Sequence, residues 1–187
     1  MAPLLRSTSG RSDLIDASSP LMRFTIRTKT NSRVSSDGTE TASRDPYIEQ
    51  ADIQRGPTLN LTDETSLCAF ARFCDPEGQV WNLVEEEGDR AAELTRVEAR
   101  GCPSGRLVAW NKETNVAIEP RFKPSIGLVE DPKLGISGPL WVRGGAIVVS
   151  ADGDKYEIRN RVTLCRCSAS SNKPFCDGSH ASIGFNA

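Results

Sequence analysis

The hydrophobic and polar positions of this 187-residue chain follow three different patterns along its length. Residues 1–36 show no persistent apolar period and are rich in Ser and Thr. Such a segment cannot bury enough surface to offset the entropy of ordering, so it is predicted to be mostly disordered. From Leu59 to Trp110 the apolar residues recur with a helical period, and after residue 138 they form short runs between turn signals. The pattern predicts an α+β fold.

Two helices are predicted in the middle region. The first would begin near Thr62 or Asp63, either of which is a good N-cap residue. Its apolar positions, spaced i, i+3, i+4 and i+7, are Leu67, Phe70, Ala71 and Cys74.

The second helix is predicted from Asp89 to Gly101, which is a helix stop. Ala91, Leu94 and Val97 would form its apolar stripe. A short strand at 108–110 follows it. These elements suggest a small α/β unit.

The last third of the chain reads as a small antiparallel β unit. Residues 119–137 contain several Pro and Gly and are predicted to be an irregular connector with packing anchors. Turns are expected at Gly144-Gly145 and Asp152-Gly153. The strands are predicted at 140–143, 146–149, 156–159 and 162–164. The predicted domain division is 1–36, 37–118, 119–137 and 138–187.

Composition narrows the class of protein. The formal net charge is −2, so no basic surface argues for binding to nucleic acid. No apolar run approaches the ~18–20 residues of a membrane span, so no membrane association is expected. A cytoplasmic location is predicted. The alternative is the mitochondrial matrix, if residues 1–36 are a transit peptide, although their acidic residues and weak amphipathicity disfavour this.

Three of the six cysteines and the only histidine gather near the C-terminus, as Cys165, Cys167, Cys176 and His180. Thiolates are soft ligands for iron–sulfur clusters, zinc or Cu(I), and imidazole binds iron and zinc alike. This set therefore predicts a metal site. Three Cys and one His also make a closed zinc set, but C-x-C lacks the usual zinc spacing. A disulfide is less consistent, since three cysteines leave one unpaired.

The full pattern is C-x-C-x2-S-x3-P-x-C-D-G-S-H, with Ser170 and Pro174 at the intermediate positions. It resembles the CDGSH iron–sulfur family at each defining position. The resemblance implies a [2Fe-2S] cluster with Cys165 and Cys167 on one iron and with Cys176 and His180 on the other. It also implies that the small β unit presents the cluster loop.

The remaining cysteines are Cys68, Cys74 and Cys102, and Pro103 follows the last of them. This set resembles the divergent single-cluster ferredoxin-like domain. In ordinary ferredoxin spacing, C-x2-C-x2-C and a remote Cys-Pro hold the cluster, and here Ala71 occupies the middle position. Three thiolates suit a [3Fe-4S] cluster, or a [4Fe-4S] cluster with an external ligand on its fourth iron. The alternative is that these cysteines are small buried hydrophobic residues.

Residues 37–43 resemble a segment of longer bacterial CDGSH proteins, in which a first CDGSH motif stands immediately before it. The residues that precede this segment here contain no Cys or His. The resemblance therefore implies that one cluster of the longer architecture is missing.

The predicted function is one-electron transfer through iron–sulfur clusters, by an electron carrier rather than an enzyme. Replacement of a thiolate by imidazole removes negative charge and should raise the potential of the [2Fe-2S] cluster. A second hypothesis is cluster transfer or redox and pH sensing, and a third is a structural zinc module. The expected partner is a redox protein or an apo-acceptor of a cluster. A homodimer is predicted, and the alternative is that the middle domain fills the place of the second subunit.

Overall fold

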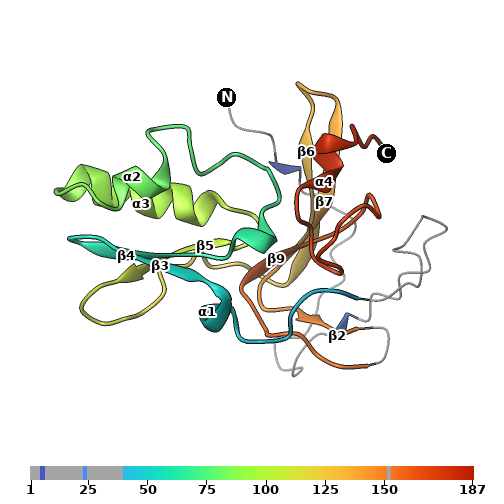
Figure 1. Cartoon of the computed structure of the whole chain (residues 1–187), viewed down its shortest axis with the longest axis horizontal. Helices are drawn as coiled ribbons and strands as arrows, with labels where there is room; N and C mark the ends of the chain where they lie inside the picture. Colours follow the sequence, from blue (N-terminus) through green and yellow to red (C-terminus); the bar gives the residue numbers. More distant parts are fainter. Residues whose placement is uncertain (1–4, 7–22, 25–39, 151–152) are drawn as a thin grey trace.

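The computed structural model describes residues 5–6, 23–24, 40–150 and 153–187. It confirms the α+β class, with two small antiparallel sheets in two halves that lie side by side (Figure 1). Most of residues 1–36, for which disorder is predicted, lie outside the described residues. The exceptions are two short strands. These are β1 (Leu5–Arg6) and β2 (Arg23–Phe24).

The first half is a three-stranded sheet covered by two helices on one face (Figure 1). The antiparallel strands have the order β3-β4-β5 and comprise β3 (Asp52–Arg55), β4 (Leu59–Asp63) and β5 (Leu107–Asn111). The helices are α2 (Val80–Leu83) and α3 (Asp89–Gly101). The bounds predicted for the second helix are therefore confirmed.

The buried face of α3 matches the predicted stripe at Ala91 and departs from it at Val97. Ala91, Ala92 and Ala99 are buried, whereas Val97 is 53% exposed. The small alanines allow the helix to approach the sheet closely, so steric fit and not side-chain hydrophobicity alone decides which face turns inward.

The prediction of a first helix near Thr62 is wrong. Strand β4 extends through Asp63, and only a 3-10 turn, η1 (Thr65–Leu67), follows it. Beyond η1, Phe70 and Arg72 have φ angles of 54° and 56°. These left-handed conformations are incompatible with an α-helix, and they fold residues 68–74 into an irregular loop.

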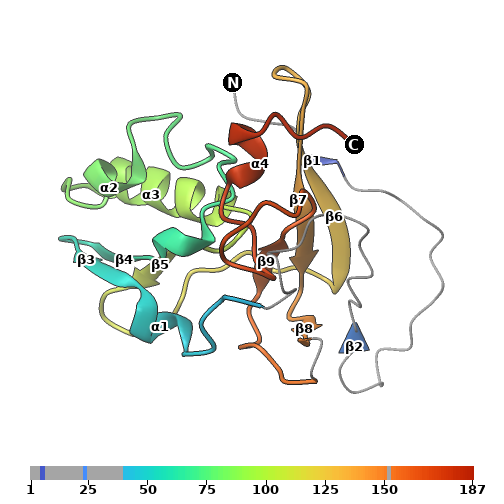
Figure 2. The same ribbon diagram turned by 45° about the vertical axis from the view of Figure 1, so that its right-hand side comes forward.

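The second half is built on antiparallel strands β6 (Ser125–Asp131), β7 (Ile136–Arg143) and β9 (Arg161–Leu164). Strand β1 pairs with β6 on the outer edge, and β2 pairs in parallel with β8 (Ile147–Val148). The short helices α1 (Tyr47–Gln50) and α4 (Ser179–Ser182) complete the described elements. Figure 2 shows α4 beside β7, near the C-terminus.

Two secondary-structure predictions for this half are corrected. The supposed irregular connector at 119–137 contains β6, in which Gly127 pairs with Trp141, and the start of β7. Pro124 immediately precedes β6, and Pro132 and Gly135 lie in the turn that follows it. Residues 156–159 form no strand, although Tyr156 still donates its backbone N–H to the carbonyl of Val148. The Gly144-Gly145 turn is present, with both φ angles positive. The turn at Asp152-Gly153 lies partly outside the described residues.

One hydrophobic core joins the two halves. It contains residues from α1, η1 and β5 of the first half, and from β7, β8 and β9 of the second. Its buried members include Tyr47, Leu67, Val108, Val142, Val148, Val162, Leu164 and Phe175. Among the described helices, none has the length and apolar character needed to cross a membrane.

Candidate metal centres

The C-terminal loop, residues 165–180, begins where β9 ends and leads into α4. The loop folds back along the end of β9. Cys165 donates its N–H to the carbonyl of Pro174, and Cys176 donates its N–H to the carbonyl of Thr163, each at 2.9 Å. This pairing brings Cys176 back beside the first cysteines of the loop. Gly178, with φ of 87°, then reverses the chain so that α4 begins at Ser179.

The four donors of this loop form two close pairs. The Sγ atoms of Cys165 and Cys167 are 3.8 Å apart, and Cys176 Sγ lies 3.4 Å from Nδ1 of His180. Across the described part of the chain, no three His, Cys, Asp or Glu side chains converge as ligands of a single metal ion. The arrangement therefore offers two two-donor positions.

Asp177 holds the turn between the two halves of the loop. Its carboxylate accepts hydrogen bonds from the backbone N–H and the hydroxyl of Ser171, both at 2.8 Å. It also accepts bonds from the N–H and hydroxyl of Ser179, at 3.0 and 2.6 Å. Burial opposes ionisation, but these bonds lower the pKa of Asp177 to about 2.

The donors themselves are buried. Cys176 is 3% exposed and His180 is 6% exposed. Burial raises the pKa of the Cys176 thiol to about 12, and it lowers the pKa of His180. A thiolate at Cys176 therefore requires a compensating cation at neutral pH, and His180 is held in the neutral form that binds metals. The donor set fits an iron–sulfur cluster.

Cys68, Cys74 and Cys102, the three-cysteine site, line one cavity with an empty volume of about 290 Å³. Cys68 follows η1, Cys74 ends the irregular loop, and Cys102 caps the C-terminus of α3. Burial, and then the neighbouring Cys102 thiol, raise the pKa of Cys74 to about 11. The structure thus brings together cysteines that are far apart in the sequence. All six cysteines of the chain are free of disulfides.

The surroundings of this cavity favour an anion. Phe70 and Arg72 adopt left-handed backbone conformations within the loop, a geometry from which backbone N–H groups can form an anion-binding concavity. Arg106 also lines the cavity, and its guanidinium pairs with Asp63 at 2.5 and 2.8 Å. Despite burial, this ion pair raises the pKa of Arg106. Cationic groups next to the cysteines stabilise their thiolates.

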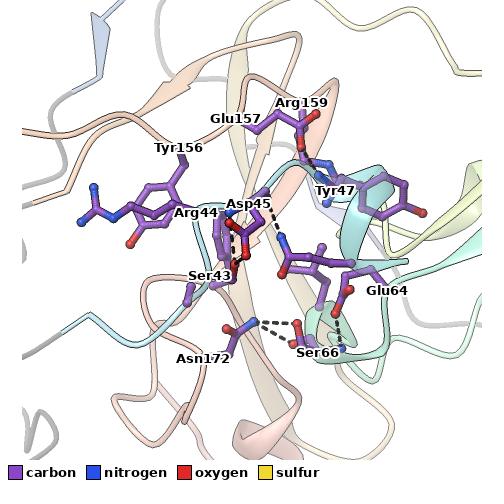
Figure 3. Close-up of a pocket in the computed structure, with 14 residues that line it drawn as sticks. Ser43, Arg44, Asp45, Tyr47, Glu64, Ser66, Tyr156, Glu157, Arg159 and Asn172 are labelled. Atoms are coloured by element: carbon purple, nitrogen blue, oxygen red, sulfur yellow. Dashed lines mark hydrogen bonds between the residues drawn. The ribbon is translucent and has the colours of Figure 1, made fainter. Parts of the chain in front are cut away.

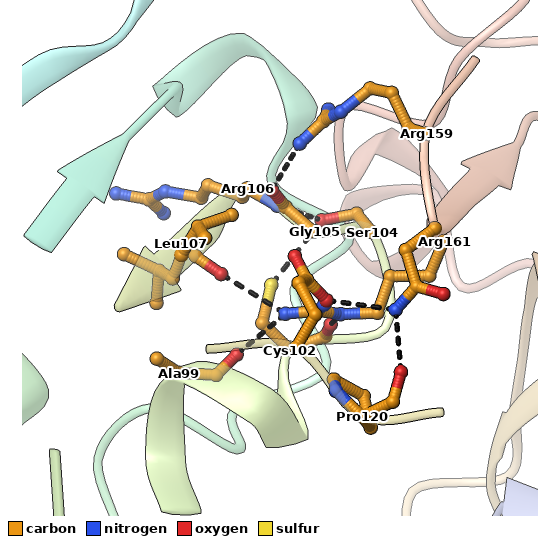
Figure 4. A network of polar contacts seen from close by, with 12 residues as sticks. Ala99, Cys102, Ser104, Gly105, Arg106, Leu107, Pro120, Arg159 and Arg161 are labelled. Carbon is orange, nitrogen blue, oxygen red and sulfur yellow. Dashed lines mark hydrogen bonds and ion pairs between the residues drawn. The ribbon is translucent and has the colours of Figure 1, made fainter. Parts of the chain in front are cut away.

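Sequence reasoning missed a buried arginine that holds Cys102 in place. Arg161, on β9 of the other half, is 1% exposed and points at the end of α3 (Figure 4). It donates to the carbonyls of Cys102, Ala99 and Leu107 at 2.6, 2.9 and 3.1 Å. It also pairs with Glu119. No local signal in the sequence marks Arg161, since its partners come from distant segments.

The two sites adjoin each other. A Cβ atom on Gly178 would lie 3.0 Å from the carbonyl oxygen of Cys68, so the two loops touch. Asn172 of the C-terminal loop donates to the carbonyl of Ser66 at 3.0 Å. Residues 69–71 line both the three-cysteine cavity and a smaller cavity that His180 lines.

A third cavity, with an empty volume of about 410 Å³, lies between α1 and the C-terminal half (Figure 3). Its polar groups bond to one another: Glu157 accepts the N–H of Tyr47 at 2.7 Å, and Glu64 accepts that of Ser66 at 3.0 Å. The described residues that line it include no Cys or His. This cavity offers no soft ligand for a metal.

Comparison with protein families gives two matches along the chain. Residues 137–181 match the family described as iron-binding zinc finger of the CDGSH type. Residues 54–112 match the family described as divergent 4Fe-4S mono-cluster. Searches of the curated proteins and of the solved structures found no match. The two predicted resemblances are confirmed, in the predicted order.

Proposed function

Because the chain contains a CDGSH-type iron-binding domain preceded by a divergent mono-cluster domain, we propose that it is a one-electron redox protein. Cys165, Cys167, Cys176 and His180 would hold a [2Fe-2S] cluster. Cys68, Cys74 and Cys102 would hold a second iron–sulfur cluster. When bound, such clusters accept and release single electrons without bond-making chemistry by the protein.

The division of the C-terminal donors into two pairs carries this proposal. Each iron of a [2Fe-2S] cluster takes two protein ligands, whereas a structural zinc ion takes all four. The Cys165–Cys167 and Cys176–His180 distances of 3.8 and 3.4 Å group the four donors into two pairs. The N–H of Gly178, 3.4 Å from Cys176 Sγ, can stabilise negative charge on that sulfur. These contacts support a binuclear cluster over zinc.

Electron transfer is favoured over cluster transfer by the burial of the second donor pair. Cys176 and His180 are both nearly inaccessible, and residues 69–71 line a cavity together with the histidine. Release of an intact cluster would require both donors to become accessible. An electron needs no such opening, and the proposed donor or acceptor is a redox protein that docks outside the loop.

Replacement of His180 tests the proposed ligand set. His180→Cys restores a fourth thiolate, so a [2Fe-2S] spectrum should persist while its potential falls toward the ~−400 mV of all-cysteine plant-type ferredoxins. Electron paramagnetic resonance (EPR) with a redox titration measures both properties. Ala181→Cys adds a thiol one position away and should leave the potential unchanged. A colourless His180→Cys protein, or one with the wild-type potential, would refute His180 as a ligand.

Metal analysis tests the cluster class itself. Anaerobically prepared protein should contain iron and acid-labile sulfide, and Cys102→Ser should remove one EPR species while the CDGSH species remains. Zinc without sulfide would refute the redox proposal. A Cys102→Ser protein with unchanged iron would instead identify Cys68, Cys74 and Cys102 as core residues.

A further inference from the structure

The three-cysteine site lacks a fourth ligand at a definable position. Cys68, Ala71 and Cys74 follow one another at steps of three residues, which is the spacing of the first three cysteines in ordinary ferredoxins. Cys102-Pro103 corresponds to the remote cysteine. Ala71 therefore stands where the middle thiolate of such a loop would be, and it lines the cavity together with the three cysteines.

An apolar wall lies against Ala71. Its side chain is only 8% exposed and packs in a cluster with Val129 and Trp141 of strands β6 and β7. Phe73 and Phe122 pack against the same cluster. The methyl group of Ala71 cannot bind a metal, and its packing on this wall holds the backbone at this position in place.

The rest of the cavity supplies no substitute ligand. Among the described residues that line it, none carries a carboxylate, an imidazole or a hydroxyl group. Its two charged residues are Arg72 and Arg106, which attract an anionic cluster but do not bind iron. The acidic partners of these two arginines are already paired, Asp75 with Arg72 and Asp63 with Arg106.

The left-handed residues fix this arrangement. Phe70 and Arg72, at φ of 54° and 56°, flank Ala71 on both sides. Non-glycine residues adopt this conformation at a cost in free energy, so surrounding contacts must hold them. The loop is thus held in a shape that presents Cys68 and Cys74 to the cavity and packs Ala71 against the wall.

From these contacts we infer that the three-cysteine site holds a three-iron [3Fe-4S] cluster and that Ala71 closes the position of a fourth iron. The inference rests on the proposed function, which supplies the second cluster. The family description names a four-iron cluster, whereas the described residues at this site supply side-chain ligands for three irons only. The site then has no open iron for a substrate, and its role is restricted to accepting and returning one electron.

Iron stoichiometry and a restored ligand test the inference together. Wild-type protein reconstituted anaerobically with excess iron and sulfide should hold about five irons and six sulfides per chain, against about six and six with a four-iron cluster. Its oxidised form should show the EPR signal of a [3Fe-4S] cluster. Ala71→Cys should add one iron and replace this signal by that of a reduced [4Fe-4S] cluster. Ala69→Cys introduces a buried thiol out of register and should stay at five irons.

A wild-type protein with six irons and a reduced [4Fe-4S] signal would overturn the inference, as would an Ala71→Cys protein with the wild-type cluster. If Ala71→Cys does not fold, the wild-type stoichiometry and EPR spectrum decide alone. Two irons per chain would overturn both the inference and the second cluster, while the [2Fe-2S] proposal would stand. If the wild-type protein showed no [2Fe-2S] signal, the redox proposal itself would be refuted.

Discussion

The two candidate sites are built in opposite ways. The C-terminal site takes all its donors from one loop, and Asp177 braces that loop through Ser171 and Ser179, which are its close neighbours. The three-cysteine site takes its donors from two distant segments, and an arginine of the other half holds the second segment. The comparison teaches that one site is specified locally and the other by tertiary structure. Perturbations should therefore reach the two sites unequally.

The largest expected effect comes from Arg161→Met. This change removes the guanidinium group from the buried carbonyls of Ala99, Cys102 and Leu107. It also breaks the ion pair with Glu119, so the free energy of unfolding should fall by about 3–5 kcal/mol. The second cluster should be lost before the [2Fe-2S] cluster, as measured by denaturation and EPR of the same preparation. Arg161→Lys keeps the charge but lacks the planar guanidinium group, so its free energy of unfolding should lie between those of the wild type and Arg161→Met.

Arg90→Met is the matched control, because Arg90 is exposed on the same helix whose end Arg161 holds. It should change the free energy of unfolding by less than about 0.5 kcal/mol. If Arg161→Met kept both clusters and wild-type stability, the three-cysteine site would not depend on the other half.

Asp177→Ala should have a smaller effect, and it should affect the C-terminal site rather than the three-cysteine site. Four hydrogen bonds to one carboxylate are removed, and the free energy of unfolding should fall by about 2 kcal/mol. The [2Fe-2S] signal should weaken while the second cluster persists. Asp177→Asn retains an acceptor oxygen and should recover part of the loss. Equal loss of both clusters in Asp177→Ala would show that the C-terminal site is not locally determined.

The smallest effect concerns the pH dependence of the three-cysteine half. Glu98 of α3 is 1% exposed and accepts the N–H of Glu77 at 2.9 Å, so it ties the segment after Cys74 to the helix before Cys102. Burial raises the pKa of Glu98, although the hydrogen bond opposes this. The folded state therefore binds the proton more tightly than the unfolded state, whose pKa is ~4.3. Its contribution to stability is full below that pH and is lost as pH rises through the folded pKa.

Glu98→Gln should remove this part of the pH dependence. Its melting temperature should exceed that of the wild type at pH 7, by an amount corresponding to about 1 kcal/mol or less, and the difference should vanish near pH 4. Thermal unfolding at several pH values measures the effect. Glu93→Gln, on the exposed face of the same helix, should show no such trend. A Glu98→Gln protein that is less stable than the wild type at pH 7 would contradict the assignment.

Sequence reasoning succeeded where the signals are local. The C-terminal motif contains both its donors and its turn residues, and Asp89 and Gly101 mark the ends of α3. The spacing of Leu67, Ala71 and Cys74 misled, because these residues face different surroundings. Leu67 joins the shared core, Ala71 packs on Val129 and Trp141, and Cys74 packs in the core of the first half. The apolar spacing of a helix is therefore present in residues 67–74, although these residues do not form a helix.

Arg161 shows why the rest was inaccessible. A charged residue at the start of a strand usually faces solvent, and nothing near it in the sequence indicates that it is buried. Its position follows from three carbonyls that the fold brings to it. The same limit applies to the contact of Gly178 with Cys68, which requires both halves to be in place.

The placement of Arg161 also has a consequence for the order of events during synthesis. Arg161 follows its partners Cys102 and Ala99 by 59 and 62 residues along the chain. At roughly 5–20 residues per second, a ribosome needs several seconds to cover that interval. During that time the carbonyls of Ala99 and Cys102 have only the backbone N–H groups of Cys102 and Gly105 as donors, and the guanidinium group is absent. The first half of the molecule is therefore synthesised first, but its packing around Cys102 is completed only when the second half is present.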